Sequence, residues 1–473
     1  MSGMNARSTN VPMGTANPQM WRGLIPMLFG ATVALVLVLA LDREGGTRFW
    51  MFWIIGVCLF YAVRDPVTGL CLLALSTPFE FIFYGWGVGR YNTIAYLAIA
   101  MGLIWFVLLP RFRAKIKKHE WLFIALLTWS AITLLWADND PERGVGILFT
   151  YAGLFVVLVV FSRGITDLTS VIRVLWYLVI GVMGEGAIML LYYQTSTWVT
   201  AYGNAYMSTF GGADEVSHYE FGNAAIVAFV ACLGLSEFDR SVFRRRIALV
   251  CALLLGTSIM LTLGRSLALE LVMASVAWVV FTRRFHGKLR KATIASAIVA
   301  VTVGAGILIN PGALALRWNM SLAQLESGDV RGFTTGRSVL WQFAIEEFRE
   351  NPLAGIGIGQ IPAAYRDRMG ELRGTHSQYL AMLAETGVVG FVLWVVLFVA
   401  LGVKAWQADP WRHLALAWWV YYVIELAGHS AGRNKAFWIV AGITVAISYQ
   451  VRAHSGRIRP SPAPTVQRAT VGL

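Results

Sequence analysis

One segment of the chain, residues 311–379, has the composition of an anion-binding site. It contains seven arginines and no lysine. A planar guanidinium group binds phosphate or carboxylate through two parallel hydrogen bonds, whereas an ammonium group acts as a point charge. Arginine without lysine therefore favours specific recognition of a phosphate or a carboxylate over diffuse attraction. The arginines are Arg317, Arg331, Arg337, Arg349, Arg366, Arg368 and Arg373.

His376 follows these arginines and stands just before a long apolar run. A histidine with an ordinary pKa of about 6.5 can accept a proton at neutral pH. A single histidine is most often a surface or capping residue. Its position beside the arginine-rich segment favours the alternative, a general base.

Residues 336–350 are predicted to form an amphipathic helix that lies along a membrane surface. Thr335 is the expected N-cap, and Asn351 with Pro352 is expected to end the helix. Arg337 then lies in the first turn, where the helix dipole disfavours a cation. A phosphate bound there would offset that cost, so an anion site and a solvent-exposed arginine both stay open. The apolar stripe comprises Val339, Leu340, Phe343, Ala344 and Phe348.

Three alternating glycines, Gly355, Gly357 and Gly359, follow this predicted helix. As a nucleotide-binding signal the pattern is weak, because it lacks the strand, turn and helix that such motifs need. It favours a tight turn that lets the backbone approach another segment closely.

The composition places the chain in a lipid environment. Of its 473 residues, 57% are hydrophobic and only 14% are charged, and the mean hydropathy is +0.62. A soluble protein carries roughly a quarter charged residues. The net charge of +13 arises from short basic segments between apolar runs, which is typical of anchors that face anionic lipid headgroups. We therefore expect membrane lipid, and no nucleic acid, as a partner.

Apolar runs of about twenty residues can cross a bilayer as helices. The pattern predicts an all-α polytopic membrane protein of roughly 12–14 transmembrane helices, with one large extracytoplasmic loop that contains short amphipathic helices. The candidate spans are 23–41, 49–63, 67–84, 92–109, 121–136, 145–161, 170–193, 221–236, 247–263, 266–282, 293–309, 387–403, 412–428 and 436–450.

Basic residues concentrate in alternate loops, and such loops face the cytoplasm. This orientation predicts a cytoplasmic N-terminal tail at 1–22 and a cytoplasmic C-terminal tail at 451–473. Between them lie an N-terminal membrane region at 23–246 and a second region at 247–450, whose loop 310–386 is extracytoplasmic. The basic segments are Arg111–Lys118, Arg240–Arg246, Arg283–Lys291 and the tail with Arg452, Arg457 and Arg459.

Four motifs occur in order across residues 261–387. They are Leu261-Thr-Leu-Gly-Arg265-Ser, Gly336-Arg337-Ser-Val-Leu-Trp341, Asn351-Pro-Leu-Ala-Gly355-Ile-Gly357, and His376-Ser377 followed by nine residues and Gly387. In this order the motifs resemble the O-antigen ligase/polymerase family. The resemblance implies catalytic roles for Arg265 and Arg337 towards a donor diphosphate, and a base role for His376.

The resemblance also implies an activity and its setting. The expected reaction transfers a glycan from a polyprenyl-diphosphate carrier to an acceptor sugar hydroxyl in O-antigen or exopolysaccharide synthesis, with inversion and without a metal ion or other cofactor. The acceptor would be a growing glycan, lipid A core or a protein, and ligase and polymerase stay open. The expected site faces the periplasm at the bacterial inner membrane. Further residues expected to bind diphosphate or glycan are Arg331, Arg366, Arg373 and Glu385.

Two rival interpretations remain open from the residues. Asp138 and Asp140 have the spacing of a metal-dependent glycosyltransferase motif, but Asp140 with Pro141 is also typical of a helix start, which we favour. Carboxylates in or near spans, namely Glu185, Glu270 and Glu425, can mark the ion path of a transporter or lipid flippase. They can equally be satisfied by neighbouring helices, with Glu270 offsetting Arg265.

Overall fold

The computed structural model describes most of the chain between residues 56 and 457. The described residues are 56–57, 59–79, 93–193, 207–208, 215–216, 218–262, 264–283, 285–309, 319, 322–330, 334, 336–429 and 434–457. The predicted span 23–41 and most of the span 49–63 lie outside them.

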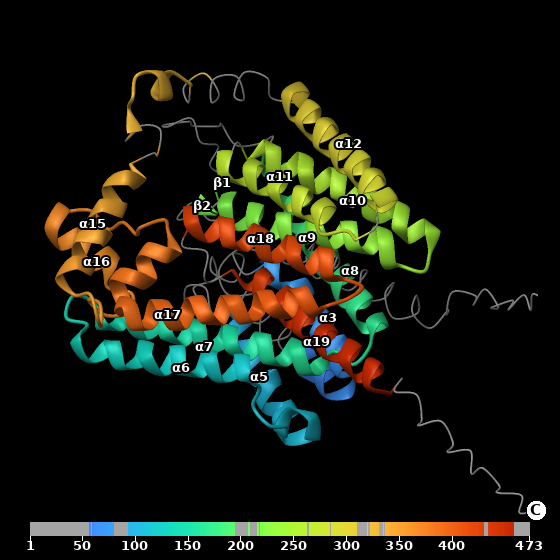
Figure 1. The fold of residues 1–473 in the computed structure, drawn as a ribbon, viewed down its shortest axis with the longest axis horizontal. Helices are drawn as coiled ribbons and strands as arrows, with labels where there is room; N and C mark the ends of the chain where they lie inside the picture. The colour runs from blue at the N-terminus through green and yellow to red at the C-terminus, as the bar shows by residue number, and fades with distance from the viewer. Residues whose placement is uncertain are drawn as a thin grey trace, which may run out of the picture.

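The described part is a bundle of helices, so the prediction of an all-α polytopic membrane protein is confirmed (Figure 1). Six described helices are long and apolar enough to cross a membrane. Every predicted span from 92–109 onward overlaps a described helix, and the span 67–84 overlaps α3 and η1 as far as residue 79. The elements are α3 Pro66–Ser76, η1 Thr77–Phe79, α5 Thr93–Leu108, η2 Pro110–Arg113, α6 Lys118–Ile132, η3 Thr133–Trp136, α7 Pro141–Gly164, α8 Leu168–Tyr193, β1 Met207–Ser208, β2 Glu215–Val216, α9 His218–Phe238, α10 Val242–Leu261, α11 Arg265–Val280, α12 Phe285–Ile309, α15 Arg337–Glu350, α16 Ile361–Met369, α17 Gln378–Gln407, α18 Arg412–Gly428 and α19 Lys435–Arg457.

The start of α7 distinguishes between the two interpretations of Asp138 and Asp140, a metal-binding motif and a helix cap. Asp140 is the N-cap, and its Oδ1 accepts a hydrogen bond of 3.0 Å from the backbone N–H of Arg143. Pro141 occupies the first helical position, where its missing N–H costs nothing. The capping interpretation is therefore confirmed.

The loops predicted to be cytoplasmic lie together at one end of the bundle. Arg163 Nη1 donates a 2.8 Å hydrogen bond to the carbonyl of Phe112, and Gln450 Nε2 donates one of 3.3 Å to the carbonyl of Ile165. Arg283 and Asp409 form an ion pair of 2.7 Å at the same end. We refer to it as the short-loop end.

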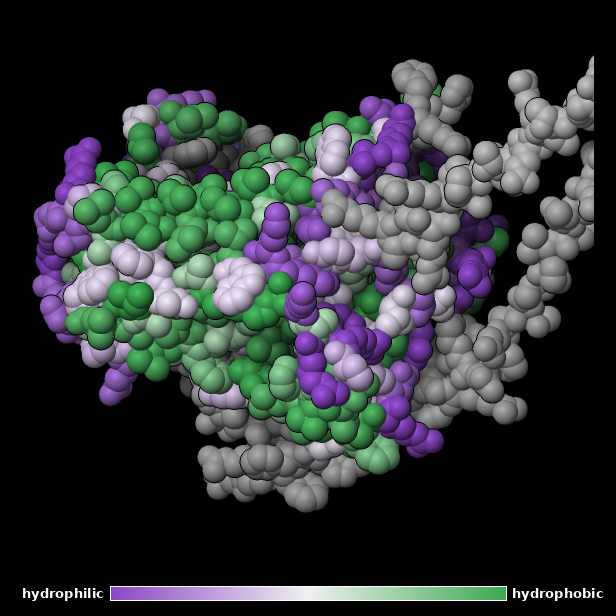
Figure 2. Space-filling model, turned by 60° about the horizontal axis from the view of Figure 1, so that its bottom comes forward, coloured by the Kyte–Doolittle hydropathy of each residue, from purple (hydrophilic) through white to green (hydrophobic). Residues whose placement is uncertain are grey.

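The opposite end carries α15 and α16 and is called the loop end (Figure 1). In Figure 2 an apolar surface covers the middle of the face turned to the viewer, and hydrophilic residues gather at the loop end and towards the other side. An apolar girdle between two polar ends is what a bilayer requires of a spanning bundle. Which end faces the periplasm stays a prediction.

The predicted N-cap of α15 is wrong. The helix begins at Arg337 after Gly336, which has a φ of 80° and serves as the N-cap without a side-chain hydrogen bond. Thr334 supplies the cap instead, because its hydroxyl accepts a 3.2 Å hydrogen bond from the backbone N–H of Ser338. Thr335 itself lies outside the described residues.

The position of α15 along a membrane surface stays a prediction, but its apolar stripe does not face lipid alone. Its stripe packs against other protein elements, because α16 and the first turns of α17 offer an apolar surface that the sequence pattern does not reveal. The buried cluster comprises Leu340, Phe343 and Ala344 of α15, Ile361 and Tyr365 of α16, and Ala384 of α17.

The glycine-rich turn connects the loop to both sides of the bundle. Gly355, Gly357 and Gly359 have φ values of 72°, 104° and 79°, a region that side chains rarely adopt. Trp136 Nε1 donates a 3.0 Å hydrogen bond to the carbonyl of Gly355, and the N–H of Gly357 donates one of 2.9 Å to the carbonyl of Glu385. The predicted tight turn is confirmed, and it fixes the loop between η3 and α17.

Gly387, the last residue of the fourth motif, has a structural reason to be glycine. It interrupts α17 with a φ of 64°, and a Cβ there would collide with the carbonyl of Leu353. The N–H of Val388 donates a 2.9 Å hydrogen bond to the carbonyl of Pro352 at this break. The break lets the nine residues after Ser377 form their own helical segment, which carries His376 to its place at the loop end.

Candidate active site

Three helix ends meet at the loop end of the bundle. Arg337 Nη1 donates a 2.8 Å hydrogen bond to the carbonyl of Gly428, the last residue of α18. The N–H of Gln378, the first residue of α17, donates one of 3.1 Å to the carbonyl of His429. These two bonds bring the start of α15 and the start of α17 to the end of α18. Arg337 and His376 therefore belong to one place, as the motifs predict.

His376 is held in an unusual backbone conformation, with a φ of 50°. Next to it, Thr375 and Ser377 form two hydrogen bonds with each other. The Thr375 hydroxyl donates to the Ser377 carbonyl at 2.7 Å and accepts from the Ser377 N–H at 3.2 Å. Such strain persists only where the surroundings enforce it, and it is common at functional sites.

The electrostatic surroundings of His376 keep its ring neutral at physiological pH. Although part of the residue is exposed, protein atoms exclude water from much of the ring, and this desolvation is the largest cause of the shift. The positive charges of Arg337 and Arg373 act in the same direction, and together these effects lower the pKa of His376 to about 4. A neutral imidazole has a lone pair that can accept a proton.

Arg373 and Arg366, both predicted to bind substrate, lie in different settings. Arg373 Nε pairs with Glu371 at 2.7 Å, while a Cβ on Gly336 would lie 4.0 Å from Arg373 Nη1. Arg373 thus lies beside the start of α15 and acts on His376. Arg366 is exposed on α16, and its Nε pairs with Asp367 at 3.0 Å. Arg331 lies outside the described residues.

Glu385, the other residue predicted to bind substrate, is buried in the protein. Its carboxylate Oε1 accepts a 3.3 Å hydrogen bond from the backbone N–H of Ile361, the first residue of α16. Together with the bond from Gly357 to its carbonyl, this contact fixes the glycine-rich turn and α16. A direct contact with substrate stays a prediction.

Arg265 is the first residue of α11 and is half-buried. Helix α11 packs along α18, and Glu270, about one and a half turns beyond Arg265, approaches the end of α18. There Glu270 Oε1 lies 3.7 Å from His429 Nδ1. The beginning of α11 thus lies at the same end of the bundle as Arg337 and His376.

The structure adds residues that the motifs do not contain. Glu270, Glu425 and His429 are all buried beside Arg337, with exposed fractions of 1%, 0% and 6%. The sequence showed carboxylates in apolar spans, but it did not show that Glu270 and Glu425 lie close to each other.

Arg368 has a structural role. Its Nη2 lies 3.0 Å from Glu347 Oε1, and its guanidinium lies 5.1 Å from the centre of the Phe343 ring. It fastens α16 to α15.

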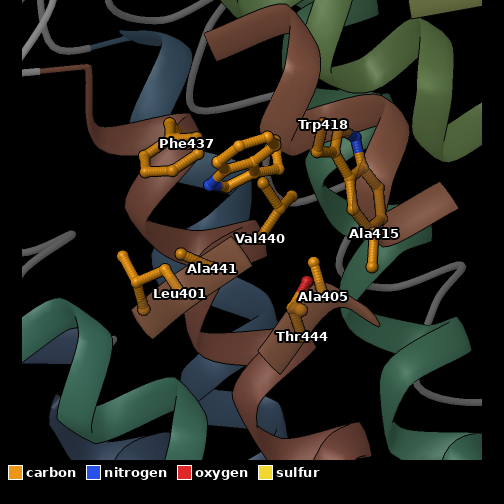
Figure 3. Close-up of a pocket in the computed structure, with 9 residues that line it drawn as sticks. Leu401, Ala405, Ala415, Trp418, Phe437, Val440, Ala441 and Thr444 are labelled. Carbon is orange, nitrogen blue, oxygen red and sulfur yellow. The ribbon is translucent and has the colours of Figure 1, made fainter. Parts of the chain in front are cut away.

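A small cavity between α17, α18 and α19 is separate from this cluster (Figure 3). Its volume of about 10 Å³ matches a single water molecule, and its lining is almost entirely apolar, with residues such as Leu401, Trp418 and Val440. Such a lining does not suit a diphosphate.

Comparison with known families supports the motif assignment. A family model described as O-antigen ligase matches residues 249–395. The matched residues are similar to this family over about a third of the chain. The resemblance seen in the motifs is thereby confirmed, and the match supports a role in membrane glycan transfer during polysaccharide biosynthesis. The matched segment runs from α10 into α17 and contains Arg265, Arg337 and His376. A search of curated proteins finds no match.

Proposed function

We propose that this protein is a glycosyltransferase that moves a glycan from a polyprenyl-diphosphate carrier to an acceptor sugar hydroxyl, as ligase or polymerase. The observation that carries the proposal is the convergence of Arg337 and His376, which lie close enough for the arginine to depress the histidine pKa. The pair offers a cation for a departing phosphate and a neutral base for an incoming hydroxyl.

The reaction is a single in-line displacement at an anomeric carbon. The acceptor oxygen forms a bond to that carbon while the bond to the diphosphate oxygen breaks, and the electron pair leaves with the diphosphate. Arg265 and Arg337 neutralise the charge that grows on the leaving group, so no metal ion is required. His376 takes the proton of the attacking hydroxyl. One displacement inverts the anomeric configuration.

The charges around His376 give the donor a second role. In the free protein Arg337 and Arg373 make the imidazole a weak base. A diphosphate bound between these arginines would offset their charge and raise the pKa of His376 towards its ordinary value. The base becomes stronger only when the donor is present, which protects the protein from activating an acceptor prematurely.

The remaining predicted contacts fit a lipid-borne donor. Arg331, Arg366 and Arg373 would bind the diphosphate or glycan at the loop end, and Glu385 would contact glycan where the loop meets α17. The carrier chain would lie in the bilayer beside the bundle. We place this end on the periplasmic face of the inner membrane, where lipid A core, a growing glycan or a protein would serve as acceptor.

The rival function, a transporter or flippase, would need carboxylates along a path through the membrane. Glu270 lies in the second turn of α11, and Glu425 lies in the last turn of α18. Both are at the loop end, beside Arg337. This position supports a role at the site of transfer more than a role in a transmembrane path.

The test is transfer by purified protein in liposomes that contain an undecaprenyl-diphosphate-linked oligosaccharide and a candidate acceptor, with and without a chelator. We expect an inverted product that still forms in the chelator. A deletion strain separates the two forms of the activity. A single capped repeat unit indicates a polymerase, and long chains retained on the carrier indicate a ligase. Unchanged surface glycans in that strain would contradict the proposal.

A further inference from the structure

The place of the His376 ring depends on how α17 begins. His376 stands two residues before this helix and has a φ of 50°, so a small rotation of the chain there moves the imidazole. The first residue of α17 is Gln378, which is 5% exposed. The contacts of Gln378 therefore fix the chain next to the proposed base.

Gln378 contacts two helices through different groups. Its backbone N–H donates the 3.1 Å hydrogen bond to the carbonyl of His429 at the end of α18. Its side-chain Nε2 donates one of 2.9 Å to the hydroxyl of Tyr151 on α7. Both side chains of this second bond are buried, since Tyr151 is 7% exposed. One residue thus joins the start of α17 to α18 and to α7.

Tyr151 comes from a part of the chain that the ligase motifs do not include. It lies 227 residues before Gln378 and outside the matched segment 249–395. The Tyr151 hydroxyl also donates to Met382 Sδ at 4.0 Å, about one turn beyond Gln378. A single hydroxyl of α7 therefore contacts one face of the first turns of α17.

We propose that Tyr151 is a positioning residue for the transfer reaction, which through Gln378 fixes the turn that orients the His376 imidazole towards the acceptor hydroxyl. The inference rests on the proposed function, because it takes His376 as the base. A buried amide donor that loses its acceptor must find another, so the Gln378 side chain would turn away and move the start of α17. A base out of line with the attacking oxygen slows the displacement, whereas the arginines that contact the diphosphate keep their places.

Tyr151→Phe removes the hydroxyl and keeps the ring. We expect kcat to fall about tenfold, because the base is misplaced. Binding of undecaprenyl diphosphate should stay within about twofold of the wild type, because Arg265 and Arg337 lie on other helices. Gln378→Met removes the donor and should have a similar effect. The double variant should be no slower than the slower single variant, because both substitutions remove the same bond.

The pKa of His376 gives a readout that a loss of stability alone would not change. Exclusion of water is the largest cause of the low pKa of about 4, and the charges of Arg337 and Arg373 act in the same direction. A loosened turn admits water to the ring, so the pKa of His376 should rise towards its ordinary value in Tyr151→Phe. The acid limb of kcat/KM then moves to higher pH.

Tyr379→Phe is the matched control. Tyr379 follows Gln378 on α17, and its hydroxyl donates a hydrogen bond of the same length, 2.9 Å, to the carbonyl of Val423 on α18. Its loss leaves the bond from the Gln378 N–H to His429, which still holds α17 to α18. We expect a similar loss of stability to that of Tyr151→Phe, with kcat and the pKa of His376 unchanged.

The measurements use the full-length protein in nanodiscs. Transfer from an undecaprenyl-diphosphate-linked oligosaccharide gives kcat per folded molecule, and binding of undecaprenyl diphosphate is measured directly. NMR of isotope-labelled histidine, assigned with His376→Ala, follows the pKa of His376. Slower transfer with donor binding kept and a raised pKa in Tyr151→Phe supports the inference. Equal effects of Tyr151→Phe and Tyr379→Phe, additive losses in the double variant, or an unchanged pKa of His376 overturns it.

Failure of the proposed function gives a different result. If the wild type transfers no glycan, the proposed function is overturned, and the NMR titration still decides whether Tyr151 controls the surroundings of His376. If Tyr151→Phe does not fold, Gln378→Met is compared with Tyr379→Phe instead. A raised pKa of His376 in Gln378→Met alone supports the inference, and equal pKa values overturn it.

Discussion

Two clusters at opposite ends of α18 contain the same kinds of side chain but differ in how they are satisfied. At the short-loop end, Glu237 Oε2 lies 2.8 Å from both His413 Nε2 and Lys291 Nζ. At the loop end, Glu270 Oε1 lies 3.7 Å from His429 Nδ1, the charge of Arg337 acts on Glu270, and a second carboxylate, Glu425, interacts with it. Both clusters combine an acid, a histidine and a longer basic side chain from three helices.

The difference separates a structural cluster from a functional one. Short ion pairs hold Glu237, His413 and Lys291 in one geometry. The loop-end cluster instead places two buried acids together, and among the described residues Glu270 Oε2 finds no hydrogen-bond partner. Such an arrangement costs free energy in the resting protein, and a bound diphosphate and a developing charge can recover that cost. The predictions below test whether this distinction holds.

The largest expected effect is at His376. His376→Ala should lower kcat by roughly 10²- to 10⁴-fold, because the attacking hydroxyl loses its base, while binding of undecaprenyl diphosphate is largely kept. The measurement is single-turnover transfer in liposomes. His413→Ala, the control from the other end of α18, should lower the melting temperature without lowering turnover per folded molecule. Intact turnover in His376→Ala would remove its role as a base.

The next effect concerns the arginines that face the diphosphate. Arg265→Ala and Arg337→Ala should each lower kcat/KM by about 10²- to 10³-fold, since each removes a donor aimed at the leaving group. Arg368→Ala provides the contrast within the same loop. It should destabilise the contact between α15 and α16 and leave more activity than either site variant. The same donor assay measures all three, and wild-type activity in Arg265→Ala would exclude it from the site.

At the short-loop end the expected effect is on stability. Glu237→Gln should lower the free energy of unfolding by about 1–3 kcal/mol, because it removes hydrogen bonds to two basic side chains. Thermal unfolding in detergent measures the loss. Turnover per folded molecule should match the wild type, and a selective loss of turnover would show that this cluster also takes part in catalysis.

The smallest effect is a shift in pH dependence. Since His376 acts as a neutral base, kcat/KM should fall as the pH drops through about 4, its pKa in the free protein. Arg373→Gln removes one of the charges that lower this pKa, so the acid limb should move to higher pH. The acid limb of kcat should also lie higher than that of kcat/KM, because bound diphosphate offsets the arginines. Coincident limbs in Arg373→Gln and wild type would exclude Arg373 from the surroundings of His376.

Local patterns in the sequence predicted the helices well. Each candidate span from 92–109 onward overlaps a described helix, because hydropathy and helical length are properties of a continuous segment. The start of α7 at Asp140 and Pro141 was predictable for the same reason, since a cap involves residues three or four apart. The cap of α15 was not predictable in this way, because the left-handed conformation of Gly336 moves the cap to Thr334.

Local sequence patterns did not predict what the apolar stripe of α15 packs against. An apolar stripe predicts that some apolar surface will cover it, but a bilayer and a neighbouring helix satisfy it equally well. The surface is provided by α16 and α17, whose residues Tyr365 and Ala384 follow Phe343 much later in the chain. The sequence pattern contains no information on that choice.

The sequence by itself determined that this is a helical membrane protein, and its motifs identified Arg265, Arg337 and His376 as the residues of interest. Only the tertiary structure decided that Arg337 reaches Gly428, which lies 91 residues further along the chain, and that Glu270 and Glu425 share one buried place. The reason is physical. Hydropathy and motif spacing depend on neighbours in sequence, whereas the energy of a buried charge depends on which distant groups the fold brings beside it.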